Sequence, residues 1–255
     1  MRRATPRTGV PFVIACGFVL LAAIVPAPAH AWGSLGHRTI AGEYGGSLPW
    51  PLDGLRSEDV WIVDHVLDPD TRKSTIPAER YRHYIDIDAY PEYHAGTLSH
   101  DRAVLEASYG AAQVEQWGVV PWAIGEVTDS LSAALATGRW DRARLWISDL
   151  CHYVGDLHQP LHCTLNYDGQ LTGNNGVHYR YETRMLDLNA AALQLDAGTV
   201  TYLPDPIDAA FAIAGAGRLT WSLGAGGAVA PVPGIYFVRM SAGENIAETR
   251  VVVGR

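Results

Sequence analysis

Apolar residues recur at spacings of three and four positions along most of the chain between residues 32 and 195. This spacing places apolar side chains on one face of a helix. The pattern predicts helices over residues 57–66, 102–117, 123–136, 140–157 and 177–195. Pro160 and the glycine-rich segment 166–176 interrupt the pattern after the fourth helix. We therefore expect an all-α helical domain over residues 32–195.

The composition changes after residue 195. Residues 196–234 are rich in Ala, Gly and Pro, and two strand-like runs follow at 235–238 and 249–253, separated by a turn-prone segment. This predicts a linker and a short β-hairpin tail over residues 196–255. Because an isolated hairpin is marginally stable in water, we expect the tail to be either part of a small β domain or a segment that pairs with another protein.

The first 31 residues have the pattern of a secretory signal peptide. Arg2, Arg3 and Arg7 form a basic start, residues 10–25 are mostly apolar, and Ala29-His30-Ala31 is a small-x-small cleavage site. The apolar stretch is too short for a comfortable membrane span. We expect cleavage after Ala31, a mature chain that begins at Trp32, and a secreted, periplasmic or cell-surface location.

Composition and charge exclude two classes of protein. The chain has 255 residues, of which 48% are hydrophobic, so it can bury a core and is not wholly disordered. Loss of the three leader arginines leaves 16 basic residues against 27 acidic ones, a net formal charge of −11. Counterion release from nucleic acid needs many Lys and Arg residues, so a polycationic coat protein is excluded. A polyanionic substrate must be held by local features.

The cysteines are uninformative. Cys16 leaves with the leader, and Cys151 and Cys163 remain. They could form one disulfide in an oxidising compartment or stay free.

Histidines and carboxylates cluster late in the helical domain. His152 and Asp156 are four residues apart, so a helix places them on one face. Pro160 ends that helix and could turn His162 back toward them. His178 and Glu182 repeat the spacing. Imidazole nitrogens and carboxylate oxygens are ligands for Zn²⁺, and two such pairs in one short stretch favour a metal site over isolated surface or core histidines.

The predicted mature terminus adds a further candidate. Trp32 follows the cleavage site and His37 lies five residues on. A free α-amino group has a pKa near 8, and when neutral it can chelate a metal together with its own carbonyl. Alternatively, Trp32 is an N-terminal hydrophobic plug.

These pieces together resemble the zinc-dependent phospholipase C and S1/P1 nuclease superfamily, secreted helical phosphodiesterases with three zinc ions. The resemblance runs from residue 32 to about 195 in the family's order. It rests on Trp32 and His37, Arg82-His83-Tyr84-Ile85-Asp86-Ile87-Asp88, Gly118-Val119-Val120-Pro121-Trp122, the run from His152 to His162, and the pair His178 and Glu182.

The resemblance implies three zinc sites. The first comprises Asp70, His83, His152 and Asp156; the second comprises His162, His178 and Glu182; the third comprises Trp32 and His37, with Asp156 bridging to the first. Asp70 is also the expected catalytic residue, a carboxylate that orients the metal-bound water or takes its proton. Asp68 and Asp64 remain alternatives to Asp70, as does a register in which His65 replaces His83. His94, His100 and His158 have no family role and are expected at exposed or supporting positions.

Two branches of this superfamily remain open. Glu182 and the short gap from His162 to His178 resemble the phospholipases. The five-residue spacing from Trp32 to His37 and the sequence Gln159-Pro160-Leu161-His162 resemble the nucleases. We expect a secreted zinc phosphodiesterase of phospholipase C type that acts on phospholipid headgroups; the alternative is an S1/P1-type endonuclease on single-stranded DNA or RNA. Either substrate could use aromatic rings, with candidates at Trp50, Trp61, Tyr81, Tyr84, Trp117, Trp122, Tyr179 and Tyr181.

The tail supports a further alternative, a non-catalytic zinc-binding surface protein. Residues 233–239 and 249–255 resemble the end of FlgD-like or secretion-sorting β domains, of which about the last third is recognisable, from Trp221. This resemblance implies a secretion or cell-surface partner for the tail.

Overall fold

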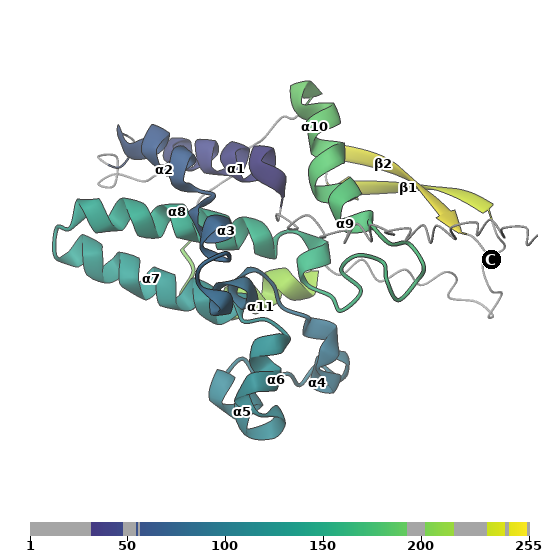
Figure 1. The fold of residues 1–255 in the computed structure, drawn as a ribbon, viewed down its shortest axis with the longest axis horizontal. Helices are drawn as coiled ribbons and strands as arrows, with labels where there is room; N and C mark the ends of the chain where they lie inside the picture. Colours follow the sequence, from purple (N-terminus) through teal and green to yellow (C-terminus); the bar gives the residue numbers. More distant parts are fainter. Residues whose placement is uncertain are drawn as a thin grey trace, which may run out of the picture.

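A computed structural model describes residues 32–47, 55, 57–192, 202–216, 234–242 and 245–253. Its centre is helix α8 (Trp140–Leu157), which packs lengthwise against α7 (Val120–Ala136) and on its other side against α1 (Gly33–Ser47) and α2 (Asp59–His65) (Figure 1). The predicted all-helical character of residues 32–195 is confirmed for the residues that the structure describes in this range.

Short helices complete the helical part. Before α7 these are α3 (Asp68–Arg72), η2 (Pro77–His83), η3 (Ile87–Ala89), α4 (Pro91–Ala95), α5 (Arg102–Tyr109) and α6 (Ala111–Gln116). After α8 they are η4 (Pro160–His162), α9 (Val177–Tyr179), the π-helical turn η5 (Arg180–Arg184), α10 (Met185–Asn189), η6 (Ala190–Ala192) and α11 (Pro206–Ala216). Helices α4, α5 and α6 project together from one side of the bundle (Figure 1).

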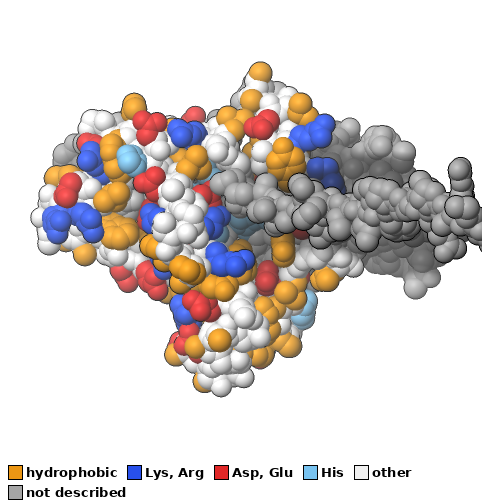
Figure 2. Space-filling view, viewed as in Figure 1, with side chains coloured by type: hydrophobic (Ala, Val, Ile, Leu, Met, Phe, Trp, Pro, Cys, Tyr) orange, Lys and Arg blue, Asp and Glu red, His pale blue; other side chains and the backbone are white. Residues whose placement is uncertain are grey.

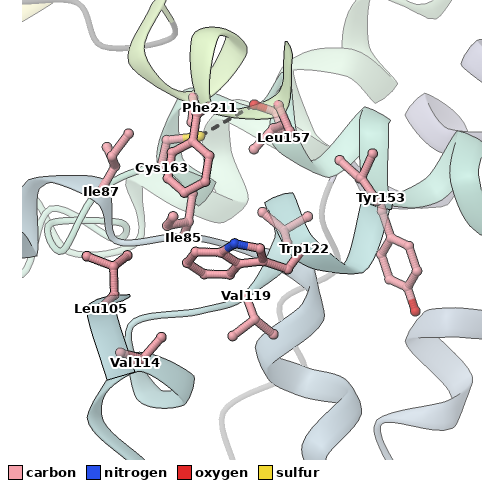
Figure 3. Packing of buried hydrophobic residues seen from close by; sticks show 14 of the residues in the cluster. Ile85, Ile87, Leu105, Val114, Val119, Trp122, Tyr153, Leu157, Cys163 and Phe211 are labelled. Carbon is pink, nitrogen blue, oxygen red and sulfur yellow. Dashed lines mark hydrogen bonds between the residues drawn. The ribbon is translucent and has the colours of Figure 1, made fainter. Parts of the chain in front are cut away.

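Two hydrophobic clusters pack against different faces of α8. The larger joins α7 and α8 to residues 85–90 and to α11, whose Phe211 packs against Trp122 (Figure 3). The smaller lies between α1, α2 and α8 and includes Ile62 and Ile147. Apolar burial stabilises a fold by about 25 cal/mol per Å², and here it fixes the helix on two faces.

Three helices differ from the sequence-based expectation. The helix expected over 102–117 is broken at Gly110, whose φ of 84° is in the region that favours glycine. The helix expected over 177–195 contains the π-helical turn η5. Helix α11 lies inside the expected linker, and its Ile207 packs so close to α7 that a Cβ on Gly125 would come within 2.8 Å of it. Because α11 is apolar on nearly all sides, it lacks the periodic pattern that would have predicted it.

At the C-terminal end, β1 (Gly234–Ala242) and β2 (Asn245–Val253) pair in antiparallel register, with Gly234 opposite Val253. The relationship to secretion-sorting domains stays a prediction. The expected signal peptide lies outside the described residues. In the part of the chain that is described, the helices are too short or too polar to cross a bilayer.

Gly118 allows two segments near the middle of the chain to meet. Its φ is +88°, and a Cβ there would lie 2.1 Å from the carbonyl oxygen of Tyr84. On either side of this contact, Val119 N donates to Tyr81 O at 2.7 Å and Val120 N donates to Tyr84 O at 3.2 Å. Any side chain at position 118 must therefore push the start of α7 away from the residues around His83.

We expect Gly118→Ala to lower the free energy of unfolding by about 3 kcal/mol, because it adds a backbone clash to positive-φ strain. Gly138→Ala is the matched control, since Gly138 has φ +65° but nothing within 4 Å of its Cβ position; it should cost only about 1 kcal/mol. Urea denaturation followed by circular dichroism measures both. Equal losses in the two variants would contradict this account.

Candidate metal centre

Eight buried histidine and carboxylate side chains meet where α8 ends. They come from α1, α3, η2, α8, η4, α9 and η5, and each is less than 10% exposed: His37, Asp70, His83, His152, Asp156, His162, His178 and Glu182. Their ligand atoms form three groups, and within each group all atoms lie within 4.8 Å of one another: His37 with His152 and Asp156; Asp70 with His83 and His152; and His162 with His178 and Glu182. Segments far apart in the sequence therefore supply one compact set of donors.

Asp156 lies between the first two groups. One carboxylate oxygen, Oδ2, is 2.8 Å from His83 Nδ1 and 3.3 Å from His152 Nε2; the other, Oδ1, is 3.2 Å from His37 Nε2. His37 stacks on His152 with ring centroids 4.0 Å apart. This approach of α1 to α8 depends on Gly155, because a Cβ there would lie 3.3 Å from His37 Nδ1.

Asp70 is the upstream carboxylate that lies beside the histidines. Its Oδ1 is 3.7 Å from His83 Nδ1 and 3.6 Å from His152 Nε2, and Lys73 forms an ion pair with it. The alternatives lie elsewhere: Asp64 pairs with Arg38 at the surface, and Asp68 pairs with His65. His65 thus lies outside the three groups, whereas His83 belongs to one of them.

The third group contains the second i, i+4 pair. Glu182 Oε2 is 2.7 Å from His178 Nε2 and 3.5 Å from His162 Nε2, and the two imidazole nitrogens are 3.1 Å apart. Asp168 accepts hydrogen bonds from the backbone N–H groups of Gly176 and His178, which anchors the helix that carries the pair. The π-helical turn η5 carries Glu182, and such turns are frequent at functional sites.

Hydrogen bonds orient two of the rings toward the groups. His152 Nδ1 lies 2.7 Å from the carbonyl of Val66, and His162 Nδ1 lies 2.7 Å from the carbonyl of His83. A carbonyl only accepts, so Nδ1 carries the proton in both rings. When such a ring is neutral, its lone pair is on Nε2, the atom that faces the other donors, as in metal-ligating histidines.

The electrostatics also suit a cation. Burial alone would raise the pKa of Asp156, but His152, His37 and His83 hold that pKa well below its usual value. Burial lowers the pKa of His83 to about 4, against the opposing effect of Asp156, so its imidazole is neutral at neutral pH. The buried atoms His37 Nε2, Asp156 Oδ1 and Glu182 Oε2 make no hydrogen bond of good geometry. An ion-paired carboxylate with free imidazole nitrogens fits the donor set for Zn²⁺.

Trp32 lies at the same end of α8. Its indole N–H donates to the carbonyl of Gly155, its ring centroid is 6.1 Å from that of Tyr181, and its carbonyl accepts a hydrogen bond from Gly36 N at 3.0 Å. Trp32 therefore contacts Gly36 and Gly155, which precede His37 and Asp156 in the sequence. The role of its α-amino group stays a prediction.

The remaining sequence candidates lie outside the three groups. His94 and His158 contact backbone carbonyls, and His100 pairs with Asp208. Cys151 and Cys163 are both free thiols, and Cys163 donates to the carbonyl of Leu157 (Figure 3).

Among the aromatic candidates, Tyr84, Tyr179 and Tyr181 adjoin ligand residues in the sequence. Trp61 stacks on His65; Tyr81, Trp117 and Trp122 belong to the larger core cluster; Trp50 lies outside the described residues. The sequence pattern does not indicate Lys73, which lies beside Asp70, or Tyr167, whose ring centroid is 6.0 Å from that of His178. Tyr167 is five residues after His162 in the glycine-rich loop, a position that could have suggested it.

A family model described as S1/P1 Nuclease matches residues 61–191, just over half of the chain. The matched range contains all of the eight buried residues except His37. No curated protein and no solved structure matches the chain.

Because Asp156 belongs to two of the expected sites, we expect Asp156→Asn to lower the zinc content by about two ions per chain, and Glu182→Gln by about one. Elemental mass spectrometry after dialysis against buffered zinc measures the stoichiometry, and circular dichroism establishes that each variant is folded. Equal losses in two folded variants would show that Asp156 does not bridge.

Proposed function

Because the chain belongs to the S1/P1 nuclease family and is thus a phosphodiester hydrolase, we propose that its substrate is single-stranded nucleic acid. The family match favours this alternative over the phospholipase C reading that Glu182 and the short His162 to His178 gap suggested. The observation that carries the zinc-hydrolase part of the proposal is the gathering of eight buried His, Asp and Glu side chains in three groups, seven of them within the matched range.

We assign the ligands as the resemblance implies. Asp70, His83, His152 and Asp156 would hold one zinc ion, and His162, His178 and Glu182 a second. Trp32 and His37 would hold a third, with Asp156 shared. Bound zinc lowers the pKa of its water molecule from far above neutrality to roughly 7 and polarises phosphoryl oxygens. Asp70, held by Lys73 at the edge of its group, is the carboxylate that would orient the attacking water or accept its proton.

The charge of the proposed zinc site explains how a chain of net negative charge could attract an anionic substrate. On the face shown in Figure 2, the described Lys and Arg side chains are interspersed with Asp and Glu and form no continuous basic track. Three Zn²⁺ ions would outweigh the charges of Asp70, Asp156 and Glu182. The attraction for phosphate would therefore be local to the centre, where burial strengthens it.

Exposed aromatic rings lie beside the third group and offer faces on which bases could stack. Tyr167 is 49% exposed next to His178, and Tyr179, the neighbour of His178 in the sequence, is 61% exposed. Tyr84 is half-buried beside His83, with its hydroxyl donating to the carbonyl of Gln116. Base stacking on such rings contributes about 1–3 kcal/mol per base and tolerates any sequence.

The substrate assay uses protein that begins at Trp32. We expect cleavage of single-stranded DNA and RNA, loss of activity with a chelator, and recovery with zinc, because the ligands are all of zinc type. Duplex DNA and phosphatidylcholine vesicles are the comparison substrates. Hydrolysis of phosphatidylcholine without cleavage of nucleic acid would favour the phospholipase alternative. A protein that binds zinc but cleaves none of these substrates would favour the non-catalytic zinc-binding alternative.

If Tyr167 stacks on a base, Tyr167→Ala should raise KM for single-stranded DNA about tenfold and change kcat little, since stacking contributes about 1–3 kcal/mol. Tyr202→Ala is the control, because Tyr202 is 86% exposed and is not a member of the three groups. Initial rates over a range of oligonucleotide concentrations separate KM from kcat. An unchanged KM for Tyr167→Ala would remove this residue from the binding surface.

A further inference from the structure

One ring nitrogen of the metal centre faces away from the donor groups. His83 Nδ1 lies 2.8 Å from Asp156 Oδ2 and 3.0 Å from His152 Nε2, so this nitrogen faces the cluster. The other nitrogen, Nε2, is buried and has no hydrogen-bond partner. Its neighbour is Glu79, whose Oε1 is 3.8 Å away. Glu79 and His83 both belong to the 3₁₀-helical segment η2 and are four positions apart in the sequence.

Glu79 belongs to a network that fixes its position. Its carboxylate is 6% exposed, accepts a hydrogen bond from the hydroxyl of Tyr153, and lies 3.3 Å from Arg72 Nη2. Arg72 in turn donates to both oxygens of Asp149, at 3.1 and 2.7 Å. Tyr153 and Asp149 come from α8, the helix that carries His152 and Asp156. The network therefore ties η2 to the rigid centre of the fold.

The charges of this network are unequal. Arg72 carries one positive charge, and it faces two nearly buried carboxylates, those of Glu79 and Asp149. Arg82 also donates to the Tyr153 hydroxyl, at 3.4 Å, but its charge is paired with that of Glu126. One negative charge is thus left uncompensated within the network, directly behind His83. A purely structural ion pair would gain nothing from a second buried carboxylate, because each buried charge costs several kcal/mol of desolvation. A cation bound on the other side of His83 would compensate this charge.

We propose that Glu79 is a positioning residue of the metal centre, which holds the proton of His83 on Nε2 and so leaves Nδ1 free for the metal. A ligand histidine commonly donates its second N–H to a carboxylate, which fixes the tautomer and the ring orientation and makes the ligand more basic. A shift of about 0.6 Å brings the 3.8 Å separation into hydrogen-bond range. Arg72 and Tyr153 hold the carboxylate so that it faces the ring.

The test measures metal affinity and not catalysis. Glu79→Gln keeps the size of the side chain and an acceptor oxygen but removes the charge. Loss of such a partner typically weakens metal binding about 10–100-fold, so we expect one zinc ion to leave this variant at about tenfold lower chelator concentration. The Co²⁺-substituted protein should show a shifted visible absorption spectrum, since the geometry around His83 changes. The melting temperature of the metal-free protein should change little.

Glu126→Gln is the matched control. Glu126 is exposed and pairs with Arg82 at 2.6 Å at the far side of Tyr153, without contact to His83. The zinc affinity and the Co²⁺ spectrum of the Glu126→Gln protein should equal those of the wild type. If Glu79→Gln does not fold, Tyr153→Phe is the second variant, because it removes the hydroxyl that holds Glu79. This variant should bind one zinc ion with several-fold lower affinity.

Unchanged zinc affinity and Co²⁺ spectrum in a folded Glu79 or Tyr153 variant would overturn the proposal and leave a structural network. The inference rests on the proposed zinc site but not on the substrate. A wild-type protein that binds zinc without cleaving nucleic acid would refute the proposed function alone, whereas a wild-type protein that binds no zinc would refute both.

Discussion

The buried carboxylate of Asp156 is the group on which the rest of the site depends. Its oxygens lie within 3.3 Å of nitrogens of His37, His83 and His152, and its side chain has no exposed surface. An isolated ionised carboxylate is strongly disfavoured in such surroundings, so positive charge must be supplied next to it. Imidazolium groups or metal ions can supply it, and only metal ions can also use the lone pairs that the neutral rings direct at the same place.

The fold holds this carboxylate by packing α8 on two sides. The cluster around Phe211 and Trp122 fixes one face of the helix, and the cluster around Ile62 fixes a second. Two glycines then allow the partner segments to approach closely. The absence of a side chain at Gly155 leaves room for His37 of α1, and its absence at Gly118 leaves room for the backbone of Tyr84 beside His83. Cores are close-packed and resist deformation. The donor atoms are therefore positioned by apolar packing and not by their own mutual attraction, which their desolvation would oppose.

The sequence predicts local geometry well and tertiary geometry poorly. The pairs His152 with Asp156 and His178 with Glu182 follow from the helical period alone, and both are found as expected. The choice of Asp70 over its neighbours needed a family spacing, because three acids within seven residues look alike until the chain folds. Glu79 and helix α11 escaped notice for related reasons. A carboxylate four residues before a histidine is common, and an apolar helix without a polar face has no period to detect.

An acidic enzyme that acts on polyanions must concentrate its positive charge. Basic side chains spread over a surface attract phosphate at long range, but salt screens them within about 10 Å. In the proposed function, ions held by buried ligands act at short range and in low dielectric, where the same charge has a larger effect. The uncompensated carboxylate of the Glu79 network fits this design, because it favours the ion while lying behind His83, away from the donor groups. The exposed rings of Tyr167 and Tyr179 then need no charge to contact bases. Without its ions such a centre would be negative and would repel the strand, so metal binding and substrate binding depend on the same residues.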